Sequence, residues 1–351
     1  MSERWLSTLP DAIRPLDRSA MAGARDRLDR LTKPPGSLGR LETLVEQLAG
    51  ITGSASLRIE RPAVVIFAAD HGVTAQGVSA YPSSVTAQMV ANFEAGGAAI
   101  NVLARAAGAK LVVIDVGVAG PERTASSRVR SGTRDMTVQP AMTRDEALAA
   151  IGVGRDVATG LVGDGCDTMA LGEMGIGNTT AASALASALT GRTPAEVTGR
   201  GTGLDDDAVR HKAAVIEAAL RRHQPRPDDP LGALAAVGGL EIAALVGAML
   251  AAAETRVPVV LDGFITGAAA LVARAIAPNI GPRLIASHRS AEPGHRIVLE
   301  RLSLEPLLDL DLRLGEGSGA ALALPLIRSA TLLRDEMATF DSAGVSGPRP
   351  S

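Results

Sequence analysis

Two glutamates lie in glycine-rich segments, each directly ahead of a stretch rich in Ala and Leu. Glu173 belongs to the segment LGEMGIGNTT at 171–180, and Glu316 belongs to LGEGSGA at 314–320. Glycines let a backbone approach a ligand closely, and a helix N-terminus supplies N–H groups and partial positive charge that favour a phosphate. A carboxylate in such a position either caps the helix or takes part in a reaction. Two of them predict a paired active site.

The loop at 175–180 offers backbone N–H donors, a helix-capping candidate in Asn178 and two threonine hydroxyls. It lacks the Gly-Lys-Ser/Thr ending of a nucleoside-triphosphate loop and the three spaced glycines of a dinucleotide fingerprint. An ordinary capped turn between a strand and a helix is one interpretation. Phosphate binding is the other, and we favour it because the loop holds more glycine than one cap requires.

A second glycine-rich segment, GRGTG at 199–203, is followed by three aspartates at 205–207. Aspartate suits a helix start, where its charge meets the positive end of the helix dipole. A metal site built from these aspartates is the less favoured alternative. Lys212 follows on the same expected helix, and it either reaches a phosphate as a point charge or is a solvated surface lysine.

Two further loops carry groups that could bind a substrate. Tyr81, the only tyrosine of the chain, lies in VSAYPSS at 78–84, ahead of an expected helix that carries Gln88. It either stacks on a flat ligand or anchors its loop on the core. The segment SHRSAEPGH at 287–295 lacks both the His-Glu-x-x-His and the Gly-x-Ser-x-Gly patterns. We interpret it as a cluster of hydroxyls and cations for an anionic substrate.

The strands and helices of the fold must bring these candidate site residues together. Apolar runs suited to buried strands lie at 63–69, 111–118, 168–171, 257–261, 283–286 and 308–314. Long stretches at helical spacing, such as 85–105 and 205–221, separate them. Strands that alternate with helices predict an α/β fold with a mostly parallel sheet and helices on both faces. The last run alternates with Asp309 and Asp311, so we expect it either at an edge of the sheet or partly solvated.

Polar residues lie at or near the ends of these runs. They are Asp70 and His71, Asp115, Glu173, Asp262, Ser287 and His288, and Glu316. In open α/β sheets, ligands bind beyond the carboxyl ends of the strands, so these positions predict one site at one edge. Asp70 and His71 are expected to support a loop there and not to react. A closed eight-stranded barrel obeys the same rule and remains the alternative fold.

The two ends of the chain have a different pattern. Helices are expected over 14–31 and 38–51, and again after Pro325 up to about residue 340. We therefore predict a small helical domain made of residues 1–60 and 326–341, and a large α/β domain over 61–325. The Gly-, Pro- and Ser-rich segment 342–351 is expected to be a disordered tail.

Composition excludes several classes of function. The chain has 351 residues, 46% of them hydrophobic but only 2% aromatic, so its core must be mostly Ala, Val, Leu and Ile. A net charge of −3 gives no basic surface for nucleic acid. The single Cys166 excludes an internal disulfide and a cysteine-rich metal site. The first residues, MSERW, lack the apolar core of a signal peptide, so none is expected. The longest apolar run, 242–253, is too short to span a bilayer. We expect a soluble cytoplasmic protein with no membrane partner.

Eight motifs together closely resemble the nicotinate-nucleotide:dimethylbenzimidazole phosphoribosyltransferase family. The resemblance extends in order from about residue 30 to 330, and each longer motif is specific. The motifs are KPPGSLG at 33–39, ADHG at 69–72, the segment 79–88, GEMGIGNTT at 172–180, GTGLD at 201–205, LDGF at 261–264, the segment 287–295 and GEGSG at 315–319.

The resemblance implies transfer of 5-phosphoribose from nicotinate mononucleotide to 5,6-dimethylbenzimidazole, with inversion at the anomeric carbon. It implies that Glu316 is the catalytic base and that Glu173 supports it from across the site. The benzimidazole pocket would map onto Ser79, Tyr81 and Gln88. The phosphate and ribose site would map onto Gly175, Gly177, Asn178, Gly201, Lys212 and Ser290. The family fold is a Rossmann-like sheet with a small helical domain from both chain ends, in a homodimer.

The residues fit this chemistry without a metal or a cofactor. The leaving pyridinium of nicotinate mononucleotide is already cationic, so it departs as a neutral ring, and a carboxylate strengthens the attacking azole by taking its proton. A helix N-terminus would lower the pKa of Glu316 and a dry pocket would raise it, and sequence does not decide between them. The alternatives are a non-catalytic sensor of nucleotides or azoles, and a nucleotide glycosidase in which water replaces the azole.

Overall fold

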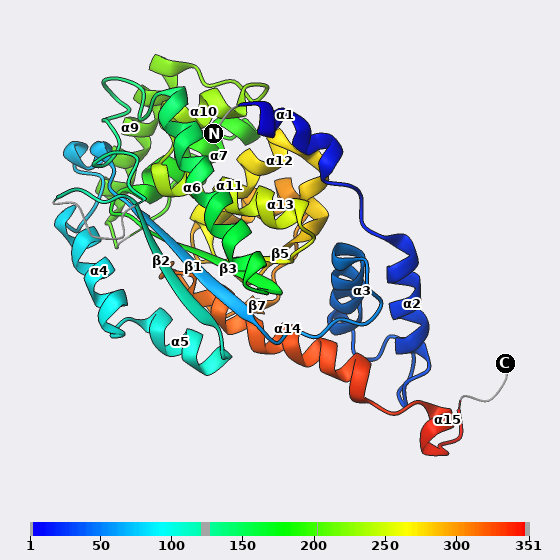
Figure 1. Ribbon diagram of the computed structural model, residues 1–351. Helices are drawn as coiled ribbons and strands as arrows, with labels where there is room; N and C mark the ends of the chain where they lie inside the picture. The colour runs from blue at the N-terminus through cyan, green and yellow to red at the C-terminus, as the bar shows by residue number, and fades with distance from the viewer. Residues whose placement is uncertain (1–2, 121–126, 202, 348–351) are drawn as a thin grey trace.

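The computed structural model describes residues 3–120, 127–201 and 203–347, and at its centre lies an open parallel sheet (Figure 1). Its five strands are β1 (Pro62–Ala69), β2 (Lys110–Gly117), β3 (Thr168–Met174), β4 (Val259–Leu261) and β5 (Leu284–Ala286), in the spatial order β2-β1-β3-β4-β5. Every neighbouring pair is parallel. The mostly parallel α/β fold is therefore confirmed. The closed barrel is excluded, because the end strands β2 and β5 do not pair with each other.

The predicted strand over 308–314 is wrong for most of its length. Only Leu308–Asp309 is a strand, β7, and it pairs with β6 (His288–Arg289) in a separate two-stranded parallel sheet. Leu310 and Leu314 are both more than half exposed, and Asp311 has a φ of 53°. The alternating aspartates keep this segment at the surface, and the left-handed residue turns the chain away from a strand path.

The two faces of the sheet are buried under different helices. Along β1, Val64, Ile66 and Ala68 pack with α4 (Ser84–Ala95), α5 (Ala99–Ala107) and α14 (Ser318–Glu336), while Val65 and Phe67 face the opposite layer. That layer contains α6 (Arg144–Gly163), α7 (Asn178–Thr190), α11 (Leu240–Glu254) and α12 (Phe264–Ile276). Figure 1 shows these two layers on either side of the strands.

Small residues let these helices pack closely, which explains a core with so few aromatic side chains. A Cβ atom on Gly154 of α6 would lie 1.8 Å from the carbonyl oxygen of Ala244, and one on Gly247 of α11 would lie 1.9 Å from that of Ile151. Both glycines are therefore required by the contact between α6 and α11. Nearly all of α11 is buried.

The stretch 85–105 forms two helices and not the single one that its spacing suggested. α4 ends at Gly96, which has a φ of 80°, and α5 begins at Ala99. A left-handed glycine is the usual way to end a helix. The remaining helices are α1 (Glu3–Ala12), α2 (Arg18–Asp29), α3 (Arg40–Thr52), α8 (Pro194–Val197), α9 (Asp206–His223), α10 (Pro230–Val237), α13 (Pro293–Leu302), α15 (Phe340–Ala343) and the 3₁₀ turns η1 (Gly72–Gln76) and η2 (Pro278–Arg283).

The helices from the chain ends do not all lie together. α2 and α3 pack on each other and on α14, and they project from the sheet beside α15 (Figure 1). α1 instead packs on α11 and α12, where the Trp5 indole N–H donates to Glu254 at 3.0 Å. The division into two domains stays a prediction. Of the predicted tail, Ser342 lies in α15, and residues 348–351 lie outside the described residues.

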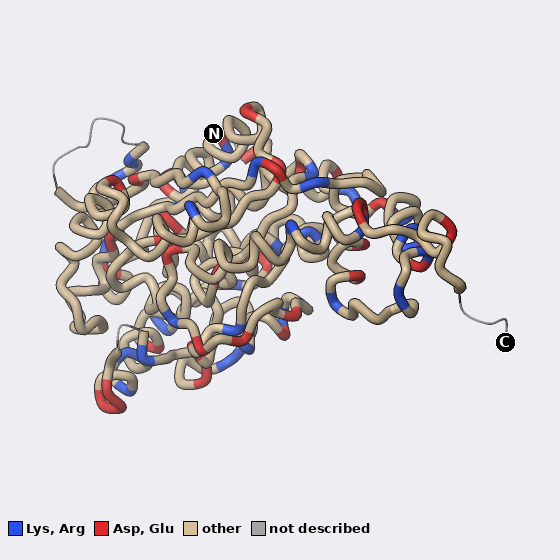
Figure 2. Tube along the Cα trace, turned by 90° about the horizontal axis from the view of Figure 1, so that it is seen from below, with Lys and Arg blue, Asp and Glu red and all other residues tan. Residues whose placement is uncertain are grey.

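Charges of both signs are interspersed along the chain in the view of Figure 2. No helix among the described residues is long and apolar enough to cross a membrane.

Candidate active site

A cavity of about 470 Å³ lies beyond the carboxyl ends of β3 and β4. Both glutamates singled out from the sequence line it, together with residues of α4 and α12 and of the 287–295 segment. In this strand order the direction of the connections reverses between β1 and β3, which is where ligands bind in doubly wound sheets. Of the polar residues predicted to form one site at this edge, Glu173, Asp262, His288 and Glu316 line the cavity, whereas Asp70, His71, Asp115 and Ser287 do not.

Glu316 lies in a tight turn directly ahead of α14. Gly315, Glu316 and Gly317 have φ values of 84°, 63° and 79°, so a non-glycine residue is held in the left-handed region. Such conformations are strained and persist where the surrounding structure imposes them. The side chain is buried, and its Oε2 atom has no hydrogen-bond partner among the described residues.

The surroundings of Glu316 raise the pKa of its carboxyl group to about 7. Burial is the main cause, and the charge of Asp262 adds to it. From the sequence, a helix N-terminus would lower the pKa of this group and a dry pocket would raise it. In the structure, burial has the larger effect. A carboxylate with a pKa near neutrality is well matched to taking a proton at physiological pH.

Glu173 lies within β3 and not in the loop where its glycine neighbours suggested. The strand extends to Met174, and α7 begins only at Asn178. Burial, followed by the charges of Glu241 and Asp262, raises the pKa of Glu173 well above its usual range. This shift favours the protonated form of the resting side chain, although the Asn178 amide donates to its Oε2 atom. Electrostatic support of a cationic ribose would require the ionised form.

Two glycines bring the glutamates together. A Cβ atom on Gly172 of β3 would lie 2.4 Å from the backbone nitrogen of Gly317, so the turn packs directly on the strand. A Cβ atom on Gly315 would lie 2.6 Å from Oε1 of Glu173. Gly172 has no room for a side chain because a Cβ atom there would meet backbone, whereas a Cβ atom at Gly315 would displace the end of the Glu173 side chain. The close packing of strand and turn places both carboxyl groups on one cavity.

Part of the predicted phosphate site lines the same cavity. Gly175, Asn178, Gly201 and Ser290 are among the lining residues, whereas Gly177 and Lys212 are not. The N-cap of α7 is Gly177, with a φ of 94°, and not Asn178, because the Asn178 side chain is directed to Glu173.

Lys212 is buried, so its interpretation as a solvated lysine is wrong. Its Nζ atom donates to the Thr179 hydroxyl at 2.6 Å, and a Cβ atom on Gly201 would lie 3.3 Å from Nζ. Burial lowers the pKa of Lys212 to about 8, while the charge of Glu292 acts in the opposite direction. A mostly charged ammonium therefore lies directly behind Thr179 and Gly201, which both line the cavity.

Burial favours the neutral form of both histidines of the 287–295 segment, and Arg289 does not line the cavity, so the cations of the predicted hydroxyl and cation cluster are not found there. The Ser290 N–H donates to Nδ1 of His295 at 2.9 Å, and burial, followed by nearby His288 and Arg289, lowers the His295 pKa to about 3. Burial also lowers the pKa of His288. Of this segment, His288, Ser290 and Glu292 line the cavity.

The predicted azole-binding residues lie at different distances from the cavity. Tyr81 lines it and is 54% exposed. Ser79 accepts a hydrogen bond from the Tyr81 N–H at 3.2 Å but does not line the cavity, and Gln88 is exposed on α4. The sequence reasoning missed the apolar lining, which is Val85, Met89, Met174, Ile176, Phe264, Ile265 and Leu314. The i, i+4 pair of Val85 and Met89 directly after the Tyr81 loop is the signal that could have found part of it.

The remaining motifs hold loops in place. Asp205 caps α9 by accepting from the Ala208 N–H at 2.8 Å, as its position before a helix suggested. His71 contacts Glu241 at 2.7 Å, and Asp70 accepts from the Ala119 N–H at 2.7 Å. Across the described ranges, no three His, Cys, Asp or Glu side chains are grouped to hold a metal ion.

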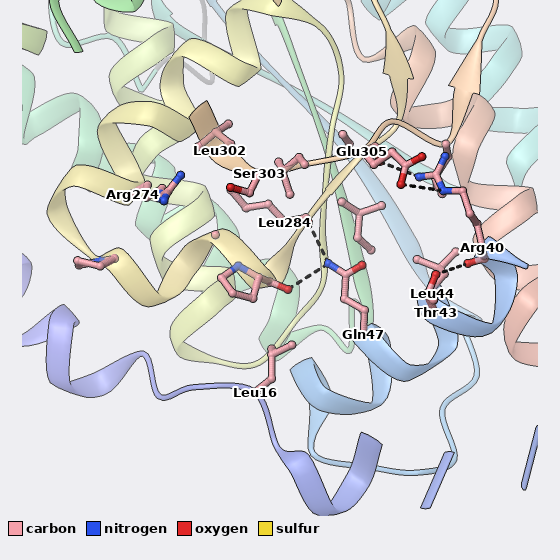
Figure 3. Close-up of a pocket in the computed structure, with 17 residues that line it drawn as sticks. Leu16, Arg40, Thr43, Leu44, Gln47, Arg274, Leu284, Leu302, Ser303 and Glu305 are labelled. Atoms are coloured by element: carbon pink, nitrogen blue, oxygen red, sulfur yellow. Dashed lines mark hydrogen bonds and ion pairs between the residues drawn. The ribbon is translucent and has the colours of Figure 1, made fainter. Parts of the chain in front are cut away.

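A second cavity, of about 570 Å³, lies between α3 and the edge of β5 (Figure 3). None of the predicted site residues line it. Gln47 donates to the carbonyl oxygens of Pro282 and Leu284 at 3.0 and 3.1 Å, and Arg40 donates to that of Glu305 at 2.8 Å (Figure 3). Arg40 also donates to the carbonyl oxygen of Pro306 at 2.5 Å. These side chains join the helix to the sheet.

Comparison with known proteins agrees with the geometry. A family model described as phosphoribosyltransferase matches residues 13–345. The nicotinate-nucleotide–dimethylbenzimidazole phosphoribosyltransferase of Chloroflexus aggregans is 58% identical over 339 residues, which cover 95% of this chain and 96% of that protein. The enzyme of the same name from Roseiflexus sp. is 56% identical over 340 residues, with the same coverage. The crystal structure of CobT from Thermus thermophilus superimposes with a TM-score of 0.90 at 49% identity, over 93% of this chain and 99% of that one.

Proposed function

This chain belongs to the nicotinate-nucleotide:dimethylbenzimidazole phosphoribosyltransferase family, and on that premise we propose the reaction that its cavity performs. The protein is a phosphoribosyltransferase of cobalamin biosynthesis. Its donor is nicotinate mononucleotide and its acceptor is 5,6-dimethylbenzimidazole. The products are nicotinate and α-ribazole 5′-phosphate, which supplies the lower ligand of the cobalamin nucleotide loop.

The main support for this proposal is the environment of the Glu316 carboxyl group. Its carboxyl group is buried, one oxygen has no partner among the described residues, and its pKa is about 7. The unpartnered Oε2 atom of Glu316 is able to accept a hydrogen bond from an azole N–H. A flat, apolar acceptor also suits the methionine, isoleucine and phenylalanine side chains that line the same cavity.

The bonds change as follows in the proposed reaction. One azole nitrogen forms a bond to the anomeric carbon of the ribose, and the bond from that carbon to the pyridinium nitrogen breaks. The electron pair of the broken bond neutralises the nicotinate ring, and the azole gives its other N–H proton to Glu316. Attack from the face opposite the leaving ring inverts the anomeric carbon. Holding both rings in this geometry provides much of the rate enhancement.

The donor phosphate is proposed to lie at the other end of the cavity. Gly175, Gly201 and Ser290 line the wall there, and the Lys212 ammonium is directly behind Thr179. A charged hydrogen bond from such a buried lysine would hold a phosphate oxygen more strongly than a solvated lysine would. The histidines add no positive charge here, so the proposed basic groups of this region are Lys212, behind Thr179, and Arg313, which lines the cavity.

The test is nicotinate release from nicotinate mononucleotide, measured with and without 5,6-dimethylbenzimidazole, together with detection of the ribotide. Release that requires the azole and yields α-ribazole 5′-phosphate is expected. Azole-independent release would replace the proposal with a nucleotide glycosidase. Saturable binding without any release would replace it with a sensor. The stereochemistry of the ribotide, read from the anomeric proton coupling, tests the inversion.

The remaining expectations are also proposals. A homodimer in the cytoplasm, and a small helical domain made of residues 1–60 and 326–341, are implied by the resemblance and by the sequence pattern. Sedimentation equilibrium would test the dimer.

A further inference from the structure

Asp262 holds the turn that carries Glu316. It follows β4 and is 1% exposed. Its Oδ2 atom accepts the N–H of Gly317 at 3.1 Å, and its Oδ1 atom accepts those of Gly319 and Ala320 at 2.7 and 3.2 Å. The Gly317 N–H belongs to the peptide bond that leaves Glu316. The Asp262 carboxylate, which directly follows β4, therefore binds both the 315–317 turn and the start of α14.

These three N–H groups would otherwise be available to an anion at the start of the helix. Backbone donors and the helix dipole lower the pKa of a carboxyl group near them. Asp262 occupies the donors, so they do not act on Glu316, and it adds a negative charge that raises the Glu316 pKa. This explains why a carboxyl group beside a helix N-terminus has a pKa near neutrality.

Among the described residues, the other titratable and charged groups around Glu316 do not accept these three N–H groups. Glu173 on β3, His288 on β6, and Glu292 and Arg313 line the same cavity. Burial raises the pKa of Glu173 and lowers that of His288, so it favours the neutral form of both side chains. His288 packs on Gly319, with its Nδ1 atom 3.9 Å from Asp262.

We propose that Asp262 is a positioning residue for phosphoribosyl transfer, because it fixes the 315–317 turn and so directs the unpartnered oxygen of Glu316 into the cavity. This inference rests on the proposed function. Asp262 does not contact the reacting atoms in this role and acts only through Glu316. Two consequences follow, one for the geometry of the base and one for its proton affinity.

The experiment compares the pH profiles of kcat/KM for azole-dependent nicotinate release in wild type and in Asp262→Asn. The amide keeps one acceptor oxygen but loses the charge and, depending on which oxygen the NH2 group replaces, one or two of the three N–H hydrogen bonds. We expect a loss in kcat of about tenfold or more, because the turn that carries Glu316 is then held by fewer hydrogen bonds. We also expect the acidic limb of the profile to move about one pH unit lower. The Asp17→Asn variant is the matched control, because Asp17 caps α2 by accepting from the Ala20 N–H at 3.0 Å. It should leave both readouts unchanged.

A double-mutant cycle separates positioning from general damage. In the Glu316→Gln background, Asp262→Asn should cost little further activity, because residues that act as a unit are not additive. Circular dichroism and thermal melting establish folding, and Asp262→Ser is a second variant that can still cap a helix.

Three results would overturn the inference. They are an unmoved acidic limb in a folded variant, additive losses in the double mutant, and loss of the native fold in both Asp262 variants, which would assign Asp262 to stability alone. A wild-type protein that forms no ribotide would instead refute the proposed function, so the two failures are distinguishable.

Discussion

The cavity beyond β3 and β4 and the cavity beside α3 are similar in volume, at about 470 and 570 Å³, but they differ in the hydrogen bonding of their polar groups. In the cavity beyond β3 and β4, Glu316 has a buried oxygen without a partner among the described residues, and its pKa is raised to about 7. In the cavity beside α3, Gln47 and Arg40 donate to backbone carbonyl oxygens (Figure 3). A buried polar atom that lacks a partner costs free energy. A buried polar atom without a partner at the wall of a cavity therefore indicates a ligand site, whereas the volume of a cavity alone does not.

The largest expected effect is on the chemistry of the first cavity. Glu316→Gln keeps the size of the side chain but removes the base, so turnover should fall by about 10²–10⁴-fold. Calorimetric titration with nicotinate mononucleotide should give a nearly unchanged affinity. Turnover close to that of wild type would remove Glu316 from the role of base.

Lys212→Met should act on donor binding. The substitution keeps a long apolar chain in the buried position but removes the ammonium behind Thr179. A hydrogen bond to a charged group contributes about 1.5–3 kcal/mol, so KM for nicotinate mononucleotide should rise by about 10- to 100-fold. Lys110→Met is the control, because Lys110 is an exposed residue at the start of β2. An unchanged KM would place the phosphate elsewhere.

Gly172→Ala tests whether close packing places the two glutamates. Its Cβ atom would lie 2.4 Å from the Gly317 nitrogen, so the turn must shift. We expect a loss of about 1–3 kcal/mol of stability together with reduced kcat, measured by denaturant unfolding and nicotinate release. Gly160→Ala in α6 has open space around its Cβ atom and should gain about 0.5–1 kcal/mol. Full activity in Gly172→Ala would show that the base does not depend on this contact.

The raised pKa of Glu316 predicts how stability depends on pH. The folded protein holds the Glu316 proton up to about pH 7, whereas the unfolded chain releases it near its ordinary value of 4.5. Between these values the native state binds more protons, so this group makes stability fall as pH rises. Glu316→Gln removes the effect. Its melting temperature should therefore exceed that of wild type above pH 7, and the difference should shrink towards pH 4.5. A difference that is independent of pH would contradict the raised pKa.

The smallest effect is expected in the second cavity. Gln47→Ala removes two hydrogen bonds to the β5 region and should lower the free energy of unfolding by about 1 kcal/mol. Transfer activity should stay the same, because no atom of this cavity belongs to the proposed site. The exposed Gln139→Ala is the control for loss of a glutamine side chain. A large loss of activity in Gln47→Ala would mean that the second cavity also takes part in the reaction.

Much of the fold could be predicted from patterns in the sequence. Five of six apolar runs are strands of the sheet, because buried parallel strands are continuous apolar segments. The sixth apolar run and the helical stretch 85–105 differ from the prediction for local reasons. Alternating aspartates keep 310–314 at the surface, and Gly96 ends α4 in the middle of a helical stretch. Pattern alone could not show that α1 packs on α11 and α12, because that contact joins residues 249 positions apart.

The sequence by itself determined the class of fold, the family, and the gathering of polar residues at the carboxyl edge of the sheet. These follow from residue types at short spacing. Only the tertiary structure decided that burial raises the pKa of Glu173, that Lys212 is buried, and that Asp262 binds the first N–H groups of α14. Protonation and hydrogen-bond partners depend on burial and on charges brought together from distant strands, and no local pattern contains that information.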